Sequence, residues 1–225
     1  MKYLLSNLTI NINEKIYLKD PESSELGKRI IQHSILLIDT IGFDAFTFKK
    51  LGVKIGSNES SIYRYFESKH KLLLYLTSWY WTWLEYQLVL STNSIDNRIS
   101  KLEKAIDVLS QTTNLDSSFS HIDEIILKRI VINEYSKSYL TKEVDSENKE
   151  GYFSVYKRLV NRLKDMIVEV DASYKYPLTL ASTVIEGAMH QHFLKAHFQS
   201  ITECNTTLQP KDFFKDLIFN VLTTK

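Results

Sequence analysis

The most constraining feature of this sequence is the segment 47–74, TFKKLGVKIGSNESSIYRYFESKHKLLL, which predicts two short helices around a tight turn and the start of a longer helix. Its apolar residues recur at helical spacing on both sides of Gly56: Phe48, Leu51, Ile55, Ile62 and Phe66. The two short helices can therefore bury one face against each other, with Gly56 supplying the bend. This arrangement is typical of a helix-turn-helix motif.

The side chains left exposed in this segment are short polar, aromatic or guanidinium groups: Asn58, Glu59, Ser60, Ser61, Tyr63, Arg64 and Tyr65. Such groups suit contacts to phosphates and base edges in a major groove, so the segment predicts a DNA-reading helix. Two alternatives stay open. Tyr63 and Tyr65 either contact the DNA backbone or pack on the preceding helix, and Glu59 either accepts from a cytosine amino group or points away.

The same residues resemble the tetracycline-repressor (TetR) family of bacterial regulators. The matching residues are Thr47, Leu51-Gly52, Ile55-Gly56-Ser57-Asn58, Ser60-Ser61-Ile62-Tyr63, Tyr65-Phe66 and Lys69-x-x-Leu72-Leu73. The resemblance implies a three-helix DNA-binding domain, a long connector helix and a C-terminal helical bundle that binds a ligand and dimerises. It also implies that Thr47 and Lys69 lie close to phosphates; the alternatives are a simple helix cap and a solvated lysine.

Helical periodicity continues through the rest of the chain, and the expected helices span residues 24–42, 68–90, 95–112, 119–139, 143–170, 177–199 and 211–222. Residues 1–20 fit either a short strand or an ordered arm. We therefore expect an all-α chain with an N-terminal arm (1–22), a helix-turn-helix domain (23–67), and a connector helix joined to a regulatory and dimerisation domain (68–225).

Composition excludes several classes of protein. Cys204 is the one cysteine, so no intramolecular disulfide can form, which fits a reducing cytoplasm. No stretch is apolar enough for a signal peptide or membrane span, so we expect a soluble cytoplasmic protein without a membrane partner. No catalytic or cofactor motif is present, so we expect neither an enzyme nor a bound cofactor. Charge is nearly balanced overall, but residues 28–71 carry eight basic against four acidic side chains.

Aromatic residues suggest a place for a small apolar or aromatic effector. The candidate lining is Trp79, Trp83, Tyr86, Phe119, Tyr135, Tyr152, Phe153 and Tyr156. Aromatic side chains at helical spacing are more often core than pocket, so this alternative stays open.

The last two helices carry small and apolar residues that resemble the dimer interface of the family: Ala181, Ile185, Ala188, His192, Phe193, Phe213, Phe214 and Leu217. A two-fold pairing of this kind would match a palindromic operator. His190, His192 and His197 invite a metal hypothesis, but His190 and His192 lie on opposite sides of a helix, so we expect no metal site.

The expected function is that of a ligand-responsive transcriptional regulator, a repressor, that binds double-stranded DNA at a palindromic operator as a homodimer. The alternative is a helical small-molecule-binding or protein-interaction module of the same fold with weak or no specific DNA binding.

Overall fold

In this computed structural model the described residues are 10–110 and 121–223, and their regular elements are all helical. The all-α expectation is confirmed. The chain divides into two compact units, residues 1–82 with 113–154 and residues 83–112 with 155–225. The first boundary falls inside the long helix α5 (Lys69–Thr92), so residues 69–82 of this helix belong to the first unit and residues 83–92 to the second. None of the described helices is long and apolar enough to cross a membrane.

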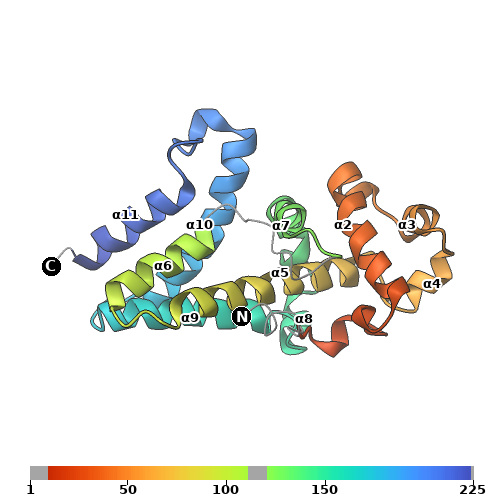
Figure 1. The fold of residues 1–225 in the computed structure, drawn as a ribbon, viewed down its shortest axis with the longest axis horizontal. Helices are drawn as coiled ribbons and strands as arrows, with labels where there is room; N and C mark the ends of the chain where they lie inside the picture. The colour runs from red at the N-terminus through yellow and green to blue at the C-terminus, as the bar shows by residue number, and fades with distance from the viewer. Residues whose placement is uncertain (1–9, 111–120, 224–225) are drawn as a thin grey trace. The chain divides into compact units, whose positions relative to one another are not determined.

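Helix α2 (Glu25–Ala45) is the scaffold of the first unit. It begins where Ser24 accepts a hydrogen bond from the Gly27 amide, the usual role of a serine N-cap. The helix buries an isoleucine face (Ile30, Ile31, Ile35 and Ile38). Gly42 has a φ of 75°, which a side chain would strain, and there the chain leaves the helical path. Figure 1 shows α3 (Phe48–Ile55) and α4 (Glu59–Tyr63) beside it.

Helices α7 (Glu124–Tyr139) and α8 (Val144–Lys149) belong to the same unit, and α7 packs on α2. The Glu134 carboxylate on α7 accepts from the Phe43 amide at 3.1 Å, just after the kink in α2. Lys137 pairs with both Glu134 and Asp44 at 2.8 Å. The backbone amide exposed by the kink is thus satisfied by another helix, as buried amides require.

The described part of the N-terminal segment is an ordered arm and not a strand. It contains the 3-10 helices η1 (Glu14–Ile16) and η2 (Pro21–Ser23), and Ile10, Ile12 and Ile16 are buried. Of the two alternatives left open by the sequence, the arm is therefore correct for residues 10–20. Residues 1–9 lie outside the described part.

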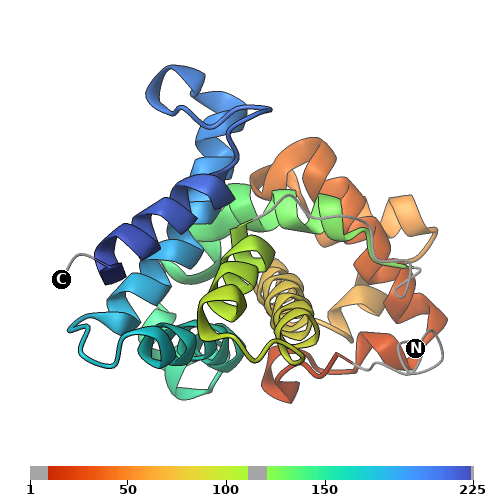
Figure 2. The ribbon, with the colours of Figure 1, turned by 60° about the vertical axis from the view of Figure 1, so that its left-hand side comes forward.

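The second unit contains the end of α5 with α6 (Arg98–Ser110), most of α9 (Ser154–Val170), α10 (Pro177–His197), η3 (Gln199–Ile201) and α11 (Pro210–Thr223). Helices α10 and α11 pack on each other and on α6 (Figure 2). The expected helix over 143–170 is instead two helices, because Gly151 adopts a left-handed φ of 81° between α8 and α9.

A buried carboxylate ties two helices of the second unit together. Glu85 of α5 accepts hydrogen bonds from Arg158 and Arg162 of α9 at 2.7 to 3.3 Å. Burial alone would raise the pKa of Glu85, but these guanidinium groups outweigh it and hold the pKa below its usual value. Glu85 is therefore the charged partner of a clamp between α5 and α9.

Candidate nucleic-acid interface and helical bundle

Helices α3 and α4 form the predicted helix-turn-helix. Thr47 caps α3 by accepting from the Lys50 amide, and Gly56 ends that helix with a φ of 61°. The Ser57 amide donates to the Gly52 carbonyl at 2.9 Å, which draws the turn close to the helix. A Cβ on residue 52 would lie 2.8 Å from the Ser57 carbonyl oxygen, so this turn requires glycine there. The motif is therefore closed by its own backbone.

The side chains of α4 are held by local hydrogen bonds. Asn58 caps α4, and its Oδ1 accepts from both the amide (2.8 Å) and the hydroxyl (2.7 Å) of Ser61. This leaves the Asn58 Nδ2 group to donate outward. The Tyr63 ring packs edge-on against Phe48, with centroids 4.9 Å apart, while 47% of the tyrosine stays exposed. Tyr63 thus combines packing on the preceding helix with an exposed surface.

Most of the residues expected to contact DNA lie exposed on this motif. The structure leaves Thr47, Asn58, Ser60, Tyr63 and Arg64 exposed, with Glu59 and Ser61 partly exposed. Lys49 and Lys54 of α3 are also exposed. In the sequence they contribute to the excess of basic residues over 28–71, but they were not among the residues expected to contact DNA. The signal for including them was present, because a helix that precedes the reading helix crosses the DNA backbone.

Tyr65 and Lys69 have other roles in the structure. Tyr65 is only 3% exposed, and its hydroxyl lies 2.8 Å from Ser24 Oγ at the start of α2. The Lys69 ammonium donates to three carbonyl oxygens near the end of α2, those of Phe43, Asp44 and Phe46, at 3.1 to 3.3 Å. In the structure, therefore, Tyr65 packs inside the unit and Lys69 caps a helix end.

The described aromatic residues that were expected to line a ligand site are buried or half-buried within their own units. Trp79 and Trp83 are 1% and 5% exposed. Tyr152 donates to the Lys15 carbonyl, Tyr156 bonds to Glu186, and Tyr135 and Phe153 each meet Tyr139 edge-on. Tyr86 is half-buried, and Phe119 lies outside the described residues. The structure therefore favours the core alternative for this set.

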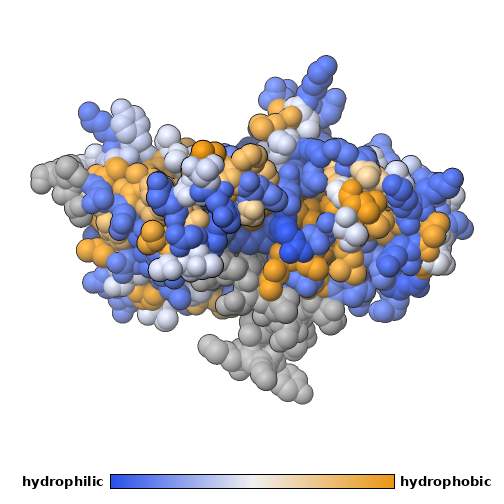
Figure 3. Space-filling model, turned by 90° about the horizontal axis from the view of Figure 1, so that it is seen from above, coloured by the Kyte–Doolittle hydropathy of each residue, from blue (hydrophilic) through white to orange (hydrophobic). Residues whose placement is uncertain are grey.

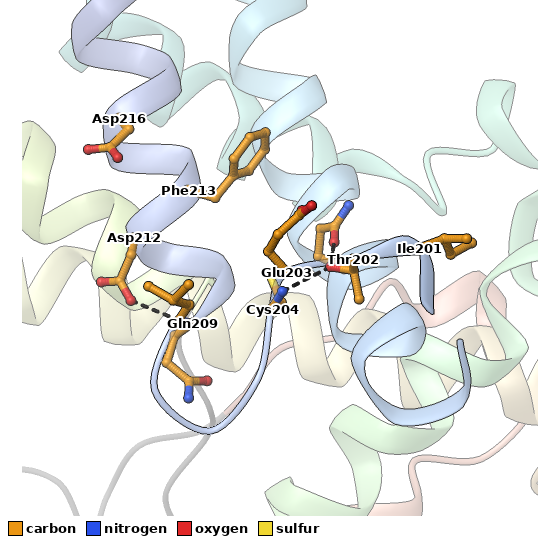
Figure 4. Close-up of a pocket in the computed structure, with 10 residues that line it drawn as sticks. Ile201, Thr202, Glu203, Cys204, Gln209, Asp212, Phe213 and Asp216 are labelled. Carbon is orange, nitrogen blue, oxygen red and sulfur yellow. Dashed lines mark hydrogen bonds between the residues drawn. The ribbon is translucent and has the colours of Figure 1, made fainter. Parts of the chain in front are cut away.

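A cavity of about 420 Å³ lies instead at the end of α10 (Figure 4). Its lining comes from α10, the segment after it, and α11: Gln191, Ile201, Thr202, Glu203, Cys204, Leu208, Gln209, Asp212, Phe213 and Asp216. Ile201, Leu208 and Phe213 are exposed apolar side chains, and the lining holds three carboxylates and no basic group. No pattern in the sequence predicts this cavity, because segment 202–209 resembles an ordinary polar loop.

The predicted dimer interface divides into two faces. Ala181, Ile185 and Ala188 have no exposed surface, and Phe214 is 3% exposed, so these residues form the core of their own unit. This corrects their assignment to an interface. The Phe214 ring covers Gly187 so closely that a Cβ there would lie 2.7 Å from it. His192 is also engaged within the unit, at 2.9 Å from the Ser110 carbonyl.

The face of α11 that carries Phe213 is not buried within the unit. Phe213, Leu217 and Val221 recur every four residues along it, and Phe213 and Val221 are 51% and 38% exposed. Hydrophobic side chains gather over this helix on the left of Figure 3. Phe193 of α10 is half-buried between the rings of His197 and Phe198. No group of three or more metal-ligating side chains occurs among the described residues, which include His190, His192 and His197.

The exposed helix-turn-helix is continued along the chain by one long helix, α5, whose second part belongs to another helical unit. Residues 30–76 match the model of the family described as bacterial regulatory proteins, tetR family. The chain therefore carries the N-terminal domain of the tetR family, as its motif indicated.

Solved structures of several proteins share the fold over most of this chain. AibR in complex with isovaleryl coenzyme A and operator DNA is 14% identical, with a TM-score of 0.55 over 86% of this chain and 97% of that chain. The fatty acid degradation regulator FadR from Bacillus halodurans is 14% identical, with a TM-score of 0.56 over 88% and 98%. The superantigen PfiT is 16% identical, with a TM-score of 0.60 over 92% and 100%. No curated protein matches the sequence significantly.

Proposed function

We propose that this protein is a ligand-responsive transcriptional repressor that binds a palindromic operator as a homodimer. The observation that carries the proposal is the exposed polar surface of α3 and α4, whose side chains are already oriented. Asn58 presents an amide donor because its oxygen is occupied by Ser61, and a fixed donor suits the N7, O6 or O4 acceptors of the major groove. Arg64 lies exposed one residue beyond α4.

Phosphate contacts in this proposal come from Thr47, Tyr63, Lys49 and Lys54. Thr47 stands at the N-terminus of α3, where backbone amides and the helix dipole favour an anion. Lys49 and Lys54 add two positive charges on the same short helix. Because such contacts release counterions, each one contributes about one unit to the salt dependence of binding.

Dimerisation in this proposal uses the outer face of α11, here called the α11 stripe and defined by Phe213, Leu217 and Val221. A two-fold pairing places the same stripe of both copies in contact, which is how most homodimers form. The buried residues of α10 support the stripe from behind without taking part in it.

The effector in this proposal occupies the cavity at the end of α10. Its volume of about 420 Å³ falls within the range typical of small-molecule sites, roughly 300–1,000 Å³. Phe213 lines this cavity and also belongs to the α11 stripe, so a bound molecule would touch the surface on which the second copy packs. The complex of AibR with both an acyl coenzyme A and operator DNA supports ligand control in this fold.

The test is selection of bound DNA from a genomic pool, followed by titration of the enriched site at several salt concentrations. Lys54→Ala should weaken binding to any sequence and lower the salt slope by about one, whereas Arg64→Ala should relax the preferred sequence. Lys175→Ala is the matched control, because Lys175 is an exposed lysine outside the motif. Absence of any enriched sequence, or equal effects of the Lys54 and Lys175 variants, would overturn the DNA-binding proposal.

The second candidate function is that of a helical interaction module, because the superantigen PfiT shares this fold. A helical interaction module of this kind would bind DNA weakly, without a preferred sequence. The same titration separates the two proposals, since only a regulator should favour the selected site over a scrambled duplex of equal length.

A further inference from the structure

The corner between α8 and α9, residues 147–152, is the place where the chain passes from the first unit toward the second. The division between the units falls just after it, between Ser154 and Val155. Gly151 makes the turn with a φ of 81°, and the Tyr152 amide donates to the Glu147 carbonyl at 3.1 Å. Residues 147–152, which we call the α8 corner, therefore belong to the first unit and continue along the chain into α9.

One end of the N-terminal arm holds the α8 corner. The Asn13 amide group donates to the Glu150 carbonyl at 2.9 Å, and the Tyr152 hydroxyl donates to the Lys15 carbonyl at 3.2 Å. Lys15 and Glu150 also form an ion pair. A Cβ on Gly151 would lie 3.4 Å from Asn13 Nδ2, so the arm packs directly on the turn.

The other end of the arm holds Tyr65, two residues beyond the reading helix α4. The Leu18 amide donates to the Tyr65 carbonyl at 2.8 Å, and the Lys19 ammonium lies 5.1 Å from the centre of the Tyr65 ring. The Tyr65 hydroxyl pairs with Ser24. Backbone, ring and hydroxyl of this one residue are thus all fixed by residues 18–24.

The stretch between the two ends is also anchored. Ile16 is 1% exposed, and Tyr17 meets Tyr75 of α5 edge-on, with ring centroids 6.0 Å apart. Only four residues lie between Asn13 and Leu18, so the chain has little slack to absorb a movement of either end. The exposed Lys15–Glu150 pair contributes little by itself, and the backbone hydrogen bonds and buried isoleucine hold the arm.

We propose that residues 10–20 form a strap that positions the reading helix α4 according to the position of the α8 corner. The inference rests on the proposed regulatory function and names a route for its control. His70 of α5 also contacts the corner, through Glu147 at 2.7 Å, so the connector helix is a separate route. The strap differs from this route because its own backbone runs from the corner to Tyr65, with Tyr17 packing on Tyr75 of α5 on the way. Tyr65 and Asn13 are positioning residues, since neither reaches DNA.

The test releases the strap at the corner while leaving the DNA-contacting face unchanged. Asn13→Ala removes both the bond to Glu150 and the cap of η1, and Glu14→Ala is the control, because Glu14 is an exposed neighbour. Asn13→Ala should increase amide hydrogen exchange over residues 59–66 and change affinity for the selected DNA by about fivefold or more, the size of a typical coupling. Glu14→Ala should do neither.

A second variant lacks residues 1–17. It removes every contact between the arm and the α8 corner, however strong each contact is. A melting curve shows whether this truncated variant is folded. If it is not folded, the test relies on Asn13→Ala alone. Unchanged DNA affinity overturns the strap if it is found in the folded truncated variant, or in Asn13→Ala when that variant exchanges faster at residues 10–18. Unchanged exchange over residues 59–66 in the same variant also overturns it. If the unmodified protein selects no DNA, the proposed function fails, yet hydrogen exchange still reports whether the arm positions α4.

Discussion

Phe213 and Phe214 are neighbours on α11 whose rings meet edge-on, with centroids 5.0 Å apart, yet only Phe214 is buried. The pair therefore tests which face of the helix is core. Phe214 is 3% exposed and lies over Gly187, whereas Phe213 is 51% exposed. Truncation of a buried phenylalanine to alanine costs about 3–5 kcal/mol, because the lost transfer energy adds to the cavity left behind. We therefore expect Phe214→Ala to destabilise the protein by an amount in that range.

Phe213→Ala should cost much less in the isolated subunit. Half of its surface already contacts solvent, so the transfer energy lost is about 1 kcal/mol. The two variants should then differ by at least about 2 kcal/mol, which corresponds to roughly 4–8 °C in melting temperature for a chain of this size. Circular dichroism melts at matched concentration measure this difference.

Protein concentration separates core from interface in the same experiment. If Phe213 belongs to the α11 stripe, the melting temperature lost in Phe213→Ala should depend on concentration, because subunit association stabilises the folded state by mass action. The loss in Phe214→Ala should persist at every concentration. Light scattering should find a smaller average mass for Phe213→Ala. Equal destabilisation by both variants, or an unmodified protein that is monomeric at micromolar concentration, would refute the assignment of faces.

Three further substitutions test individual contacts. Lys69→Met removes three hydrogen bonds to the end of α2 and should lower stability by about 1.5–3 kcal/mol even without DNA, whereas a purely phosphate-contacting lysine would leave the melt unchanged. The pKa of Glu85 is lowered in the folded state, so its contribution to stability is present above the unfolded pKa near 4.5 and is lost as pH falls through the folded pKa. Glu85→Gln should therefore destabilise the protein at pH 7 and make its stability depend less on pH in the acid range. Burial lowers the pKa of Lys128 to about 7, so stability should rise with pH from about 7 toward 10.5, and Lys128→Met should remove this rise. Urea titrations at each pH measure both effects, and an unchanged pH dependence would contradict them.

Local signals in the sequence were sufficient to place most helix ends. Ser24 and Thr47 cap helices because a serine or threonine oxygen accepts from an amide two or three residues on. Gly42 and Gly56 end or break helices because they adopt positive φ. The helix-turn-helix was predictable for the same reason: its turn, its caps and its apolar spacing all lie within a short stretch of chain. Gly151 was the exception, since the periodicity around it continued across the turn.

Only the tertiary structure decided which surface each side chain meets. The spacing of Ala181, Ile185 and Ala188 established that one face of α10 is buried, but an apolar face packs equally well on its own chain or on a second copy. An exposed ammonium likewise suits a phosphate or a helix end, and the path of α2 brought three carbonyls to Lys69. Helix caps and turns depend on neighbours along the chain, whereas the partner of a buried face or a long charged side chain depends on distant residues that only folding brings together.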